Sequence, residues 1–369
     1  MLFALRFFRL DPLMVFPPLV LISLSILLLY SVTHSQETGT LIAGAPSRQL
    51  VYALMGFIGM LVVSKTEYRL LFNFIPLLFI GTALLLVLVL IIGGPGDGIK
   101  RWIDLGLIQL QPSEFMKLVQ VIALAAFFSR FREQSQSMWT LVGSLLITAV
   151  PMGLVYLQPD LGTTLVFGCI WLGMSIMAGV RPLYLGMMGL GAVLAAPIVY
   201  LFLLKPYMQL RLLQHLDPYA DPLGAGYNVL QSVISIGSGG FFGKGLFNGT
   251  QSQLHYLRVQ QTDFIFSVLG EELGFLGGIL VFSLFLILLM RALSVASQAR
   301  DEFGRFLVVG VVMLLLTQVF FNVGVTLQLL PVTGIPLPFL SFGGSSLLTM
   351  MLGVGVLQSV YLHRKRAEW

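Results

Sequence analysis

Several carboxylates of this chain stand within or beside long apolar runs, where ionisable side chains are costly and usually serve a function. Asp263 begins one such run, and Glu271 and Glu272 follow about two helical turns deeper. A partly desolvated carboxylate at a water interface can act as a general base, because burial raises its pKa. The alternative for Asp263 is a helix N-cap, a role for which Thr262 competes. Glu271 and Glu272 are expected to pack against polar neighbours.

A second group of charges precedes another apolar run. Arg101 is followed by Pro112, Glu114 and Lys117. Pro112 suits the first turn of a helix, and Glu114 and Lys117 stand three apart on one face, where opposite charges can pair. The pair could be purely structural. Alternatively, Arg101 and Lys117 could contact an anionic head group, since Arg grips phosphate oxygens as a fork and Lys acts as a point charge.

Two more polar segments stand at the ends of apolar runs. Asp160 lies in a tight turn, where it could cap the following helix, and a direct role in a site is the alternative. Residues 330–346 are dense in Pro and Gly, and non-helical backbone at membrane depth persists only when it is buried or lines a wet cavity. This segment is predicted to be a re-entrant loop beside the site. Because the histidines are scattered and Cys169 is the sole cysteine, no dedicated metal site is expected.

The elements that must position these residues are membrane spans. The chain has 369 residues, of which 57% are hydrophobic and 10% charged, against about 45–50% and about 25% in a soluble domain. A soluble globular fold is therefore excluded. Because a span needs about 20 apolar residues, the apolar runs predict an all-α polytopic membrane protein with about ten transmembrane helices. The predicted spans are 13–33, 50–64, 70–93, 116–129, 140–157, 161–179, 183–204, 264–290, 306–330 and 339–362.

The basic residues indicate the orientation of these spans. With a cytoplasmic N-terminus, 13 of the 21 Lys and Arg residues fall on the short cytoplasmic side and eight on the longer outer loops, a bias that favours two cytoplasmic termini. The outer side then carries residues 93–113 and a large loop, 205–262, between spans 7 and 8. A connection that long usually forms a site or a lid. Within it, residues 227–236 are typical of a short amphipathic or re-entrant helix.

In their order along the chain, these motifs resemble the SEDS family of bacterial cell-wall proteins, and Val332-Thr333-Gly334 resembles its elongation branch. The resemblance is nearly full length, and it implies a single transmembrane domain over residues 1–369. Family members usually carry Pro-Glu shortly before the Thr-Asp pair, whereas residues 257–261 of this chain do not contain Pro-Glu. The matching motifs are Arg101-Trp102, Gln111-Pro-Ser-Glu114 with Lys117, Gln158-Pro-Asp160-Leu-Gly-Thr163, Asp217-Pro218, Asp221-Pro-Leu-Gly-Ala-Gly-Tyr227, Gln231-Ser232, Ile236-Gly-Ser-Gly-Gly240, Thr262-Asp-Phe-Ile-Phe266, Glu271-Glu272, Leu330-Pro-Val-Thr-Gly-Ile-Pro-Leu-Pro338 and Gly343-Gly-Ser-Ser346.

The resemblance implies a peptidoglycan glycosyltransferase for cell elongation and rod shape. Such an enzyme polymerises lipid II, an undecaprenyl-pyrophosphate disaccharide pentapeptide, by inverting β-1,4 transfer on the outer face of the bacterial cytoplasmic (inner) membrane. It implies that Asp263 is the catalytic base. The residues expected to bind the pyrophosphate are Arg101, Lys117, Arg211 and Lys244, and the supporting residues are Glu114, Asp160, Gln231, Ser232, Thr262, Glu271 and Ser341.

Inversion in one displacement requires a base and a stabilised leaving group but no covalent sugar intermediate. No cofactor is required, although a divalent cation such as Mg²⁺ could bridge the pyrophosphate. The resemblance also implies a class B penicillin-binding protein as partner, because this sequence carries no Ser-x-x-Lys transpeptidase domain, together with other elongation-complex proteins and no nucleic acid. The alternatives are a lipid II flippase, which needs cations reachable from both sides, and a scaffold that recruits the transpeptidase.

Overall fold

The computed structural model describes residues 10–33, 44–92, 101–104, 109–222, 226–254, 256–257 and 259–364. Within these residues, ten helices are long and apolar enough to cross a membrane, which confirms the predicted all-α polytopic architecture. These helices are α2 (Pro12–Thr33), α3 (Ala45–Lys65), α4 (Leu70–Ile92), α5 (Pro112–Arg130), α6 (Met138–Leu157), α7 (Leu161–Ala178), α8 (Pro182–Ile198, extended by the π-helical turn η2, Val199–Leu203), α12 (Ile265–Ser297), α13 (Glu302–Thr326) and α14 (Gly344–Leu362).

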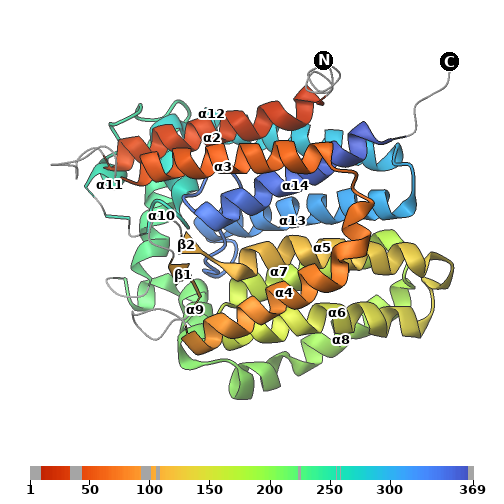
Figure 1. Ribbon diagram of the computed structural model, residues 1–369. Helices are drawn as coiled ribbons and strands as arrows, with labels where there is room; N and C mark the ends of the chain where they lie inside the picture. The colour runs from red at the N-terminus through yellow and green to blue at the C-terminus, as the bar shows by residue number, and fades with distance from the viewer. Residues whose placement is uncertain are drawn as a thin grey trace, which may run out of the picture.

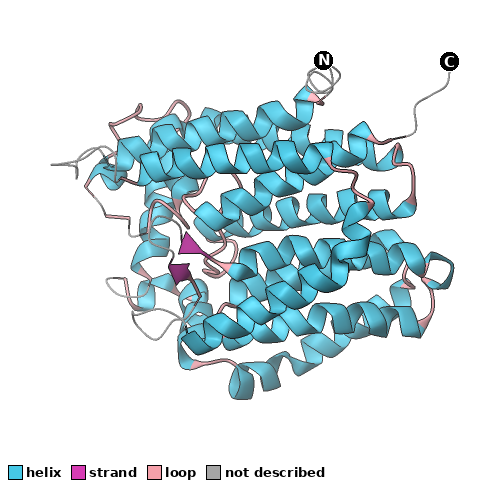
Figure 2. Cartoon of the chain, viewed as in Figure 1, coloured by secondary structure: helices cyan, strands magenta, loops and turns pink. Residues whose placement is uncertain are grey.

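The bundle has two different ends (Figures 1 and 2). The shorter elements gather at one end, and the first and last described residues lie toward the other. An even number of spans places both ends of the described chain on the same side of the bundle, as predicted. The shorter elements are the hairpin of β1 (Ile103–Asp104) and β2 (Gln109–Leu110), with α9 (Pro206–Leu216), η3 (Pro218–Ala220), α10 (Tyr227–Gly239) and α11 (Thr250–Gln253), whereas η1 (Arg132–Gln134) joins α5 to α6.

Helices α5, α13 and α14 form the centre of the bundle, and most of their side chains are buried. Small residues allow this close packing, because without a Cβ the backbones of membrane helices can approach. On α13, a side chain at Gly310 would collide with Val121 of α5 and Met174 of α7. Helix α8, by contrast, has no fully buried residue, and only Tyr184, Leu185 and Met188 pack partly against the core.

The large outer loop is mostly ordered structure rather than a free connection. It contains α9, η3, α10 and α11, and α10 confirms the helix predicted over 227–236. Helix α12 is broken opposite this loop, at Gly274, whose φ of +66° is not helical. The break corrects the continuous span predicted over 264–290. The helix can break at this point because the loop backbone supplies the hydrogen bonds that the helix lacks there.

Four backbone hydrogen bonds interlock the loop with the two halves of α12. The carbonyl of Gly240 accepts from the amide of Phe275 (3.0 Å), and that of Phe241 accepts from Leu276 (3.2 Å). On the other side of the break, Lys244 donates to the Glu271 carbonyl and Gly245 donates to the Glu272 carbonyl, each at 3.0 Å. The loop glycines therefore serve backbone contact, because a Cβ at position 243 or 274 would collide with the facing backbone.

Helix α13 ends at Thr326 and α14 begins at Gly344, so the predicted spans 306–330 and 339–362 reach too far into the segment between them. Residues 327–343 are non-helical, as their Pro and Gly content predicted. The apolar residues Leu337, Phe339 and Leu340 are nevertheless buried. They extended the hydropathy signal although they face protein rather than lipid.

Candidate active site

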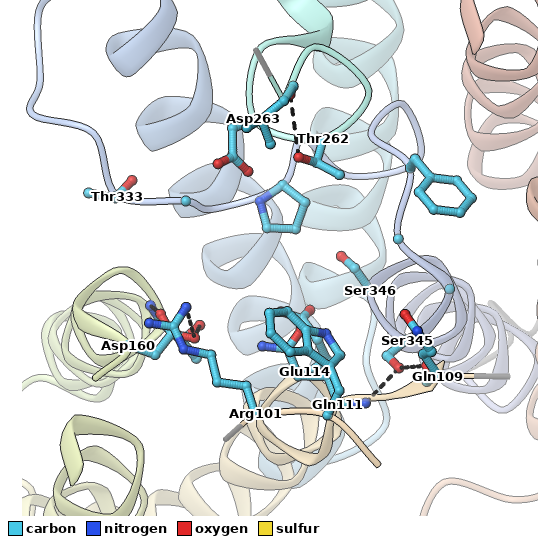
Figure 3. Close-up of a pocket in the computed structure, with 18 of the residues that line it drawn as sticks. Arg101, Gln109, Gln111, Glu114, Asp160, Thr262, Asp263, Thr333, Ser345 and Ser346 are labelled. Atoms are coloured by element: carbon cyan, nitrogen blue, oxygen red, sulfur yellow. Dashed lines mark hydrogen bonds and ion pairs between the residues drawn. The ribbon is translucent and has the colours of Figure 1, made fainter. Parts of the chain in front are cut away.

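A polar cavity of about 370 Å³ lies at the end of the bundle that carries the hairpin and α9. Figure 3 shows Asp263 and Thr333 on one side of it and Arg101, Asp160 and Glu114 on the other. Of the residues predicted to act or support, six line this cavity. They are Arg101, Glu114, Asp160, Arg211, Thr262 and Asp263.

Asp263 is held through its backbone carbonyl, and its carboxylate faces the cavity. The N-cap of α12 is Phe264, and no side chain caps this helix, so the N-cap alternative for Asp263 and Thr262 is wrong. The Asn322 side chain of α13 donates to the Asp263 carbonyl (3.0 Å) and to the Ile335 carbonyl (2.9 Å). This amide thereby fixes the distance between the carboxylate-bearing turn and the segment 331–343.

Gly334 faces the Asp263 carboxylate across a narrow gap. Its φ of +73° favours glycine, and a Cβ there would lie 3.8 Å from Asp263 Oδ2. The backbone of this segment also approaches α7 closely, because a side chain at Gly162 would collide with the Thr333 carbonyl. The segment 331–343 is therefore wedged between α7 and the turn that carries Asp263.

Burial raises the pKa of the Asp263 carboxyl above its ordinary value, because few water molecules can solvate the charged form. The negative charge of Asp160 acts in the same direction. The Thr262 hydroxyl, Arg211 and Arg101 oppose the shift, but burial is the larger effect. A carboxyl with a raised pKa binds a proton more strongly, which is the property that a general base requires.

Arg101 is fixed by the turn between α6 and α7. Its Nε donates to the Gln158 carbonyl (3.1 Å), its Nη2 donates to the Pro159 carbonyl, and its Nη1 lies 3.9 Å from Asp160 Oδ2. Asp160 caps α7, as predicted, because its carboxylate accepts from the Thr163 amide (3.1 Å) and hydroxyl (3.0 Å). The guanidinium is thus anchored beside the cavity by a capped helix start.

Arg211 approaches from α9, on the large outer loop. Its Nη1 donates to the Val332 carbonyl (3.3 Å), next to Thr333 in the cavity wall. Arg101 and Arg211 therefore bring two positive charges to the wall formed by α7, α9 and the segment 331–343. Such a pair suits a doubly charged anion.

Glu114 and Lys117 form the predicted ion pair, with Nζ 2.7 Å from Oε1. The two side chains are only 3% and 1% exposed. Glu114 lines the cavity, whereas Lys117 lies behind it and does not. The pairing is confirmed, and the phosphate contact expected of Lys117 stays a prediction.

Residues 5–366 match the sequence profile of the FtsW/RodA/SpoVE group of cell cycle proteins. The chain belongs to the FtsW/RodA/SpoVE family. The Escherichia coli (strain K12) peptidoglycan glycosyltransferase MrdB is 38% identical over 360 residues, which cover 97% of this chain and 95% of MrdB. The Bacillus subtilis stage V sporulation protein E is 39% identical over 361 residues, with 95% and 96% covered. The SEDS resemblance is thereby confirmed.

Two solved structures of related chains support the same fold. One comes from work on how a peptidoglycan synthase complex coordinates polymerization and crosslinking. It matches with a TM-score of 0.81 at 31% identity, over 97% of this chain and 99% of that one. The Thermus thermophilus rod shape determining protein RodA matches with a TM-score of 0.69 at 28% identity, over 97% and 98%. The ten-span arrangement is therefore shared within the family.

In this family member, Lys244 and Glu271 lie outside the cavity. They pair with each other, with Lys244 Nζ 2.9 Å from Glu271 Oε1. Glu271 also accepts from the amides of Gln251 (2.8 Å) and Ser252 (3.0 Å) at the start of α11. The packing against polar neighbours expected of Glu271 is confirmed, and the same holds for Glu272, which accepts from the Ser31 hydroxyl (2.5 Å).

The remaining predicted residues also stand apart from the cavity wall. Ser232 of α10 shares a hydrogen bond with Ser267 (2.7 Å) and donates to the Thr326 carbonyl (2.7 Å), and its neighbour Gln231 does not line the cavity. Ser341 donates to the Thr262 carbonyl (2.6 Å). Ser341 therefore supports the site by fixing the residue before Asp263.

The site also contains a wall that the sequence analysis missed. Ser345 of α14 accepts from the Gln111 amide (2.8 Å) and donates to the Gln109 carbonyl (3.0 Å). The Gln109 amide in turn donates to the hydroxyl of Tyr52 on α3 (3.3 Å), and Arg48 of the same helix also lines the cavity. Gln111 and Ser345 stand in motifs of the family resemblance. Arg48 and Tyr52 were not assigned to the site, although Arg48 is a lone cation at the outer start of an apolar run.

Proposed function

We propose that this chain is a peptidoglycan glycosyltransferase of the elongation type, which polymerises lipid II with Asp263 as its general base. The observation that carries the proposal is the placement of Asp263. Its carboxylate faces a polar cavity, caps no helix, and has a pKa raised by burial, with Arg101 and Arg211 among the arginines that line the cavity. The name of the relative MrdB, a peptidoglycan glycosyltransferase, supports the same activity.

The reaction follows from the chemistry of this wall. The 4-hydroxyl oxygen of the acceptor sugar attacks C1 of the donor sugar, and the bond from C1 to the pyrophosphate oxygen breaks with inversion. Asp263 takes the hydroxyl proton as the new bond forms. The pyrophosphate departs with the bonding electrons, and Arg101 and Arg211 stabilise the charge that develops on it.

We propose that any divalent cation would enter this cavity with the substrate rather than as a resident group. Among the described residues, no three His, Cys, Asp or Glu side chains converge on a metal position. Mg²⁺ bound to phosphates needs only one or two protein carboxylates, and Asp263 and Glu114 line the cavity. When bound, the cation would neutralise charge on the leaving pyrophosphate.

The proposed location is the bacterial cytoplasmic membrane, with the cavity facing outward. The distribution of arginines supports this orientation, because basic residues prefer the cytoplasmic side. Among the described residues, eight arginines lie on the connections and helix ends opposite the cavity. They are Arg69, Arg130, Arg132, Arg181, Arg291, Arg300, Arg305 and Arg364.

The proposed partner is a class B penicillin-binding protein, which would crosslink the strands that this chain polymerises, within a larger elongation complex. The structural neighbour from a peptidoglycan synthase complex that joins polymerization to crosslinking supports this pairing. The flippase alternative gains no support from the cavity, because the cavity's lining residues all come from one end of the bundle.

The decisive experiment compares Asp263→Asn with wild type in the polymerisation of labelled lipid II, with glycan strands separated on a gel. Asparagine keeps the shape of the side chain but accepts no proton, so the rate should fall by about 100-fold or more. Asp217→Asn is the matched control, because Asp217 lies on the same outer loop and caps only η3. Near wild-type polymerisation by Asp263→Asn would overturn the assignment.

Two further measurements separate the rival functions. If the chain were a flippase, Asp263→Asn would slow the movement of labelled lipid II across vesicles, and purified wild type would make no glycan. If it were a scaffold, the wild type itself would neither polymerise lipid II nor move it across vesicles. Both the wild type and Asp263→Asn would then show only partner binding. The proposal expects normal partner binding and normal melting for this variant.

A further inference from the structure

The cavity has two walls that carry arginines, and they differ in how the arginines are engaged. The first wall holds Arg101 and Arg211. Arg101 donates to two carbonyls and faces Asp160, and Arg211 donates to the Val332 carbonyl. These contacts fix both guanidinium groups in place and occupy part of their donor capacity.

The second wall holds Arg48. Among the residues that the structure describes, its side chain makes no hydrogen bond, ion pair or ring contact, although it lines the cavity and is exposed. A guanidinium carries five donors in a planar fork. All of them are available to a molecule that enters the cavity.

The helix that carries Arg48 is firmly positioned. The neighbouring Gln49 is fully buried and donates to the Ser25 hydroxyl and to the Ser341 carbonyl, each at 3.2 Å. Tyr52, one turn further along the same helix face, accepts from the Gln109 amide. Arg48 is therefore a free side chain on a firmly held helix, and Ser341 connects that helix to the residues beside Asp263.

We propose that Arg48 is a binding residue for the diphosphate of a lipid-linked substrate, at the wall formed by α3, the hairpin and α14. The inference rests on the proposed function and deepens it. Polymerisation brings two lipid-linked diphosphates to one base, and Arg101 with Arg211 provides cations at one wall only. Arg48 provides the cation at the other wall, where the fork matches phosphate oxygens.

The competing explanation is that Arg48 only attracts lipid headgroups as part of the outer surface charge. Lys205 distinguishes the two. It also stands on the outer side, at the N-cap of α9, and it is exposed, but it does not line the cavity. A surface-charge effect would appear in both variants, whereas diphosphate binding would appear in one.

The experiment measures the polymerisation rate of the purified full chain against lipid II concentration, for wild type, Arg48→Ala, Arg48→Lys and Lys205→Ala. Arg48→Ala should raise the half-saturating concentration about tenfold, the effect of losing one charge-assisted hydrogen bond. Its rate at saturation should change much less, because the base and the first wall are intact. Arg48→Lys should recover part of the loss, since it keeps the charge but not the fork.

A second readout is direct binding of lipid II in the Asp263→Asn background, with and without Arg48→Ala, and with inorganic pyrophosphate as competitor. Arg48→Ala should weaken binding and competition by similar factors. Equal half-saturation for wild type and Arg48→Ala, or an equal defect in Lys205→Ala, would overturn the inference. If wild type made no glycan, the proposed function would fail, while the binding comparison would still test Arg48.

Discussion

Removing Lys117 alone should destabilise the protein more than removing Lys117 and Glu114 together. The pair is almost fully excluded from solvent, and its two atoms are 2.7 Å apart. Among the described residues, Glu114 Oε2 has no hydrogen-bond partner, so Lys117 is the group that compensates the carboxylate. Without it, a negative charge is left uncompensated inside the bundle.

The structure sets the size of the effect. Breaking a buried pair by removing one partner costs about 3–5 kcal/mol because it leaves an uncompensated charge, whereas replacing both partners with well-packed hydrophobic residues is often neutral or stabilising. Lys117→Met keeps the length of the side chain, and Glu114→Gln keeps its shape. Lys117→Met should therefore lower the melting temperature by on the order of 5 °C or more. Adding Glu114→Gln removes the uncompensated charge and should restore part of that loss, although the buried amide keeps its own desolvation cost.

The assay is thermal melting of the detergent-solubilised chain, with polymerisation measured on the same preparations. Additive losses in the double variant would refute the reasoning, because independent sites add and coupled sites do not. So would a Lys117→Met variant that melts like wild type. If that stable variant were also inactive, the ammonium would be a direct substrate contact.

Two more outcomes follow from the geometry. Asp160→Asn should move the acid limb of the activity profile to lower pH, because the charge of Asp160 raises the pKa of Asp263 and the proposed base must be ionised to act. Arg211→Ala should move the acid limb to higher pH, because the charge of Arg211 lowers that pKa. If both variants shifted the acid limb of the kcat/KM profile in the same direction, this prediction would be contradicted. Gly243→Ala should cost about 1–3 kcal/mol in melting experiments, because φ is +79° and the new Cβ meets the α12 backbone, whereas Gly237→Ala, with open space around it, should be tolerated.

The spans could be predicted from the sequence because lipid demands long apolar helices, and that demand acts locally along the chain. The ends of α13 and α14 could not, because Phe339 and Leu340 are apolar for a different reason. They are buried in protein within a non-helical segment. Hydropathy does not distinguish burial in protein from exposure to lipid.

The site was predictable where one residue carried the signal. Asp263 is conspicuous as a carboxylate at the edge of an apolar run, and Asp160 as a cap. The wall of Arg48 and Tyr52 was not, because it depends on contacts between α3, the hairpin and α14, which lie far apart in sequence. Lys244 was assigned to the pyrophosphate by its charge, but the broken helix α12 brings Glu271 to it instead.

The interlock between the outer loop and α12 explains why the glycine-rich stretch belongs to this site. A general base acts only when its carboxylate is held within fractions of an ångström of the substrate proton. The break at Gly274 separates the short helical segment after Asp263 from the rest of α12, which would leave that segment free to shift. The bonds from Lys244 and Gly245 to the carbonyls of Glu271 and Glu272 remove that freedom. The glycines thus provide close backbone contact that fixes the segment after Asp263, the proposed base, rather than a mobile lid.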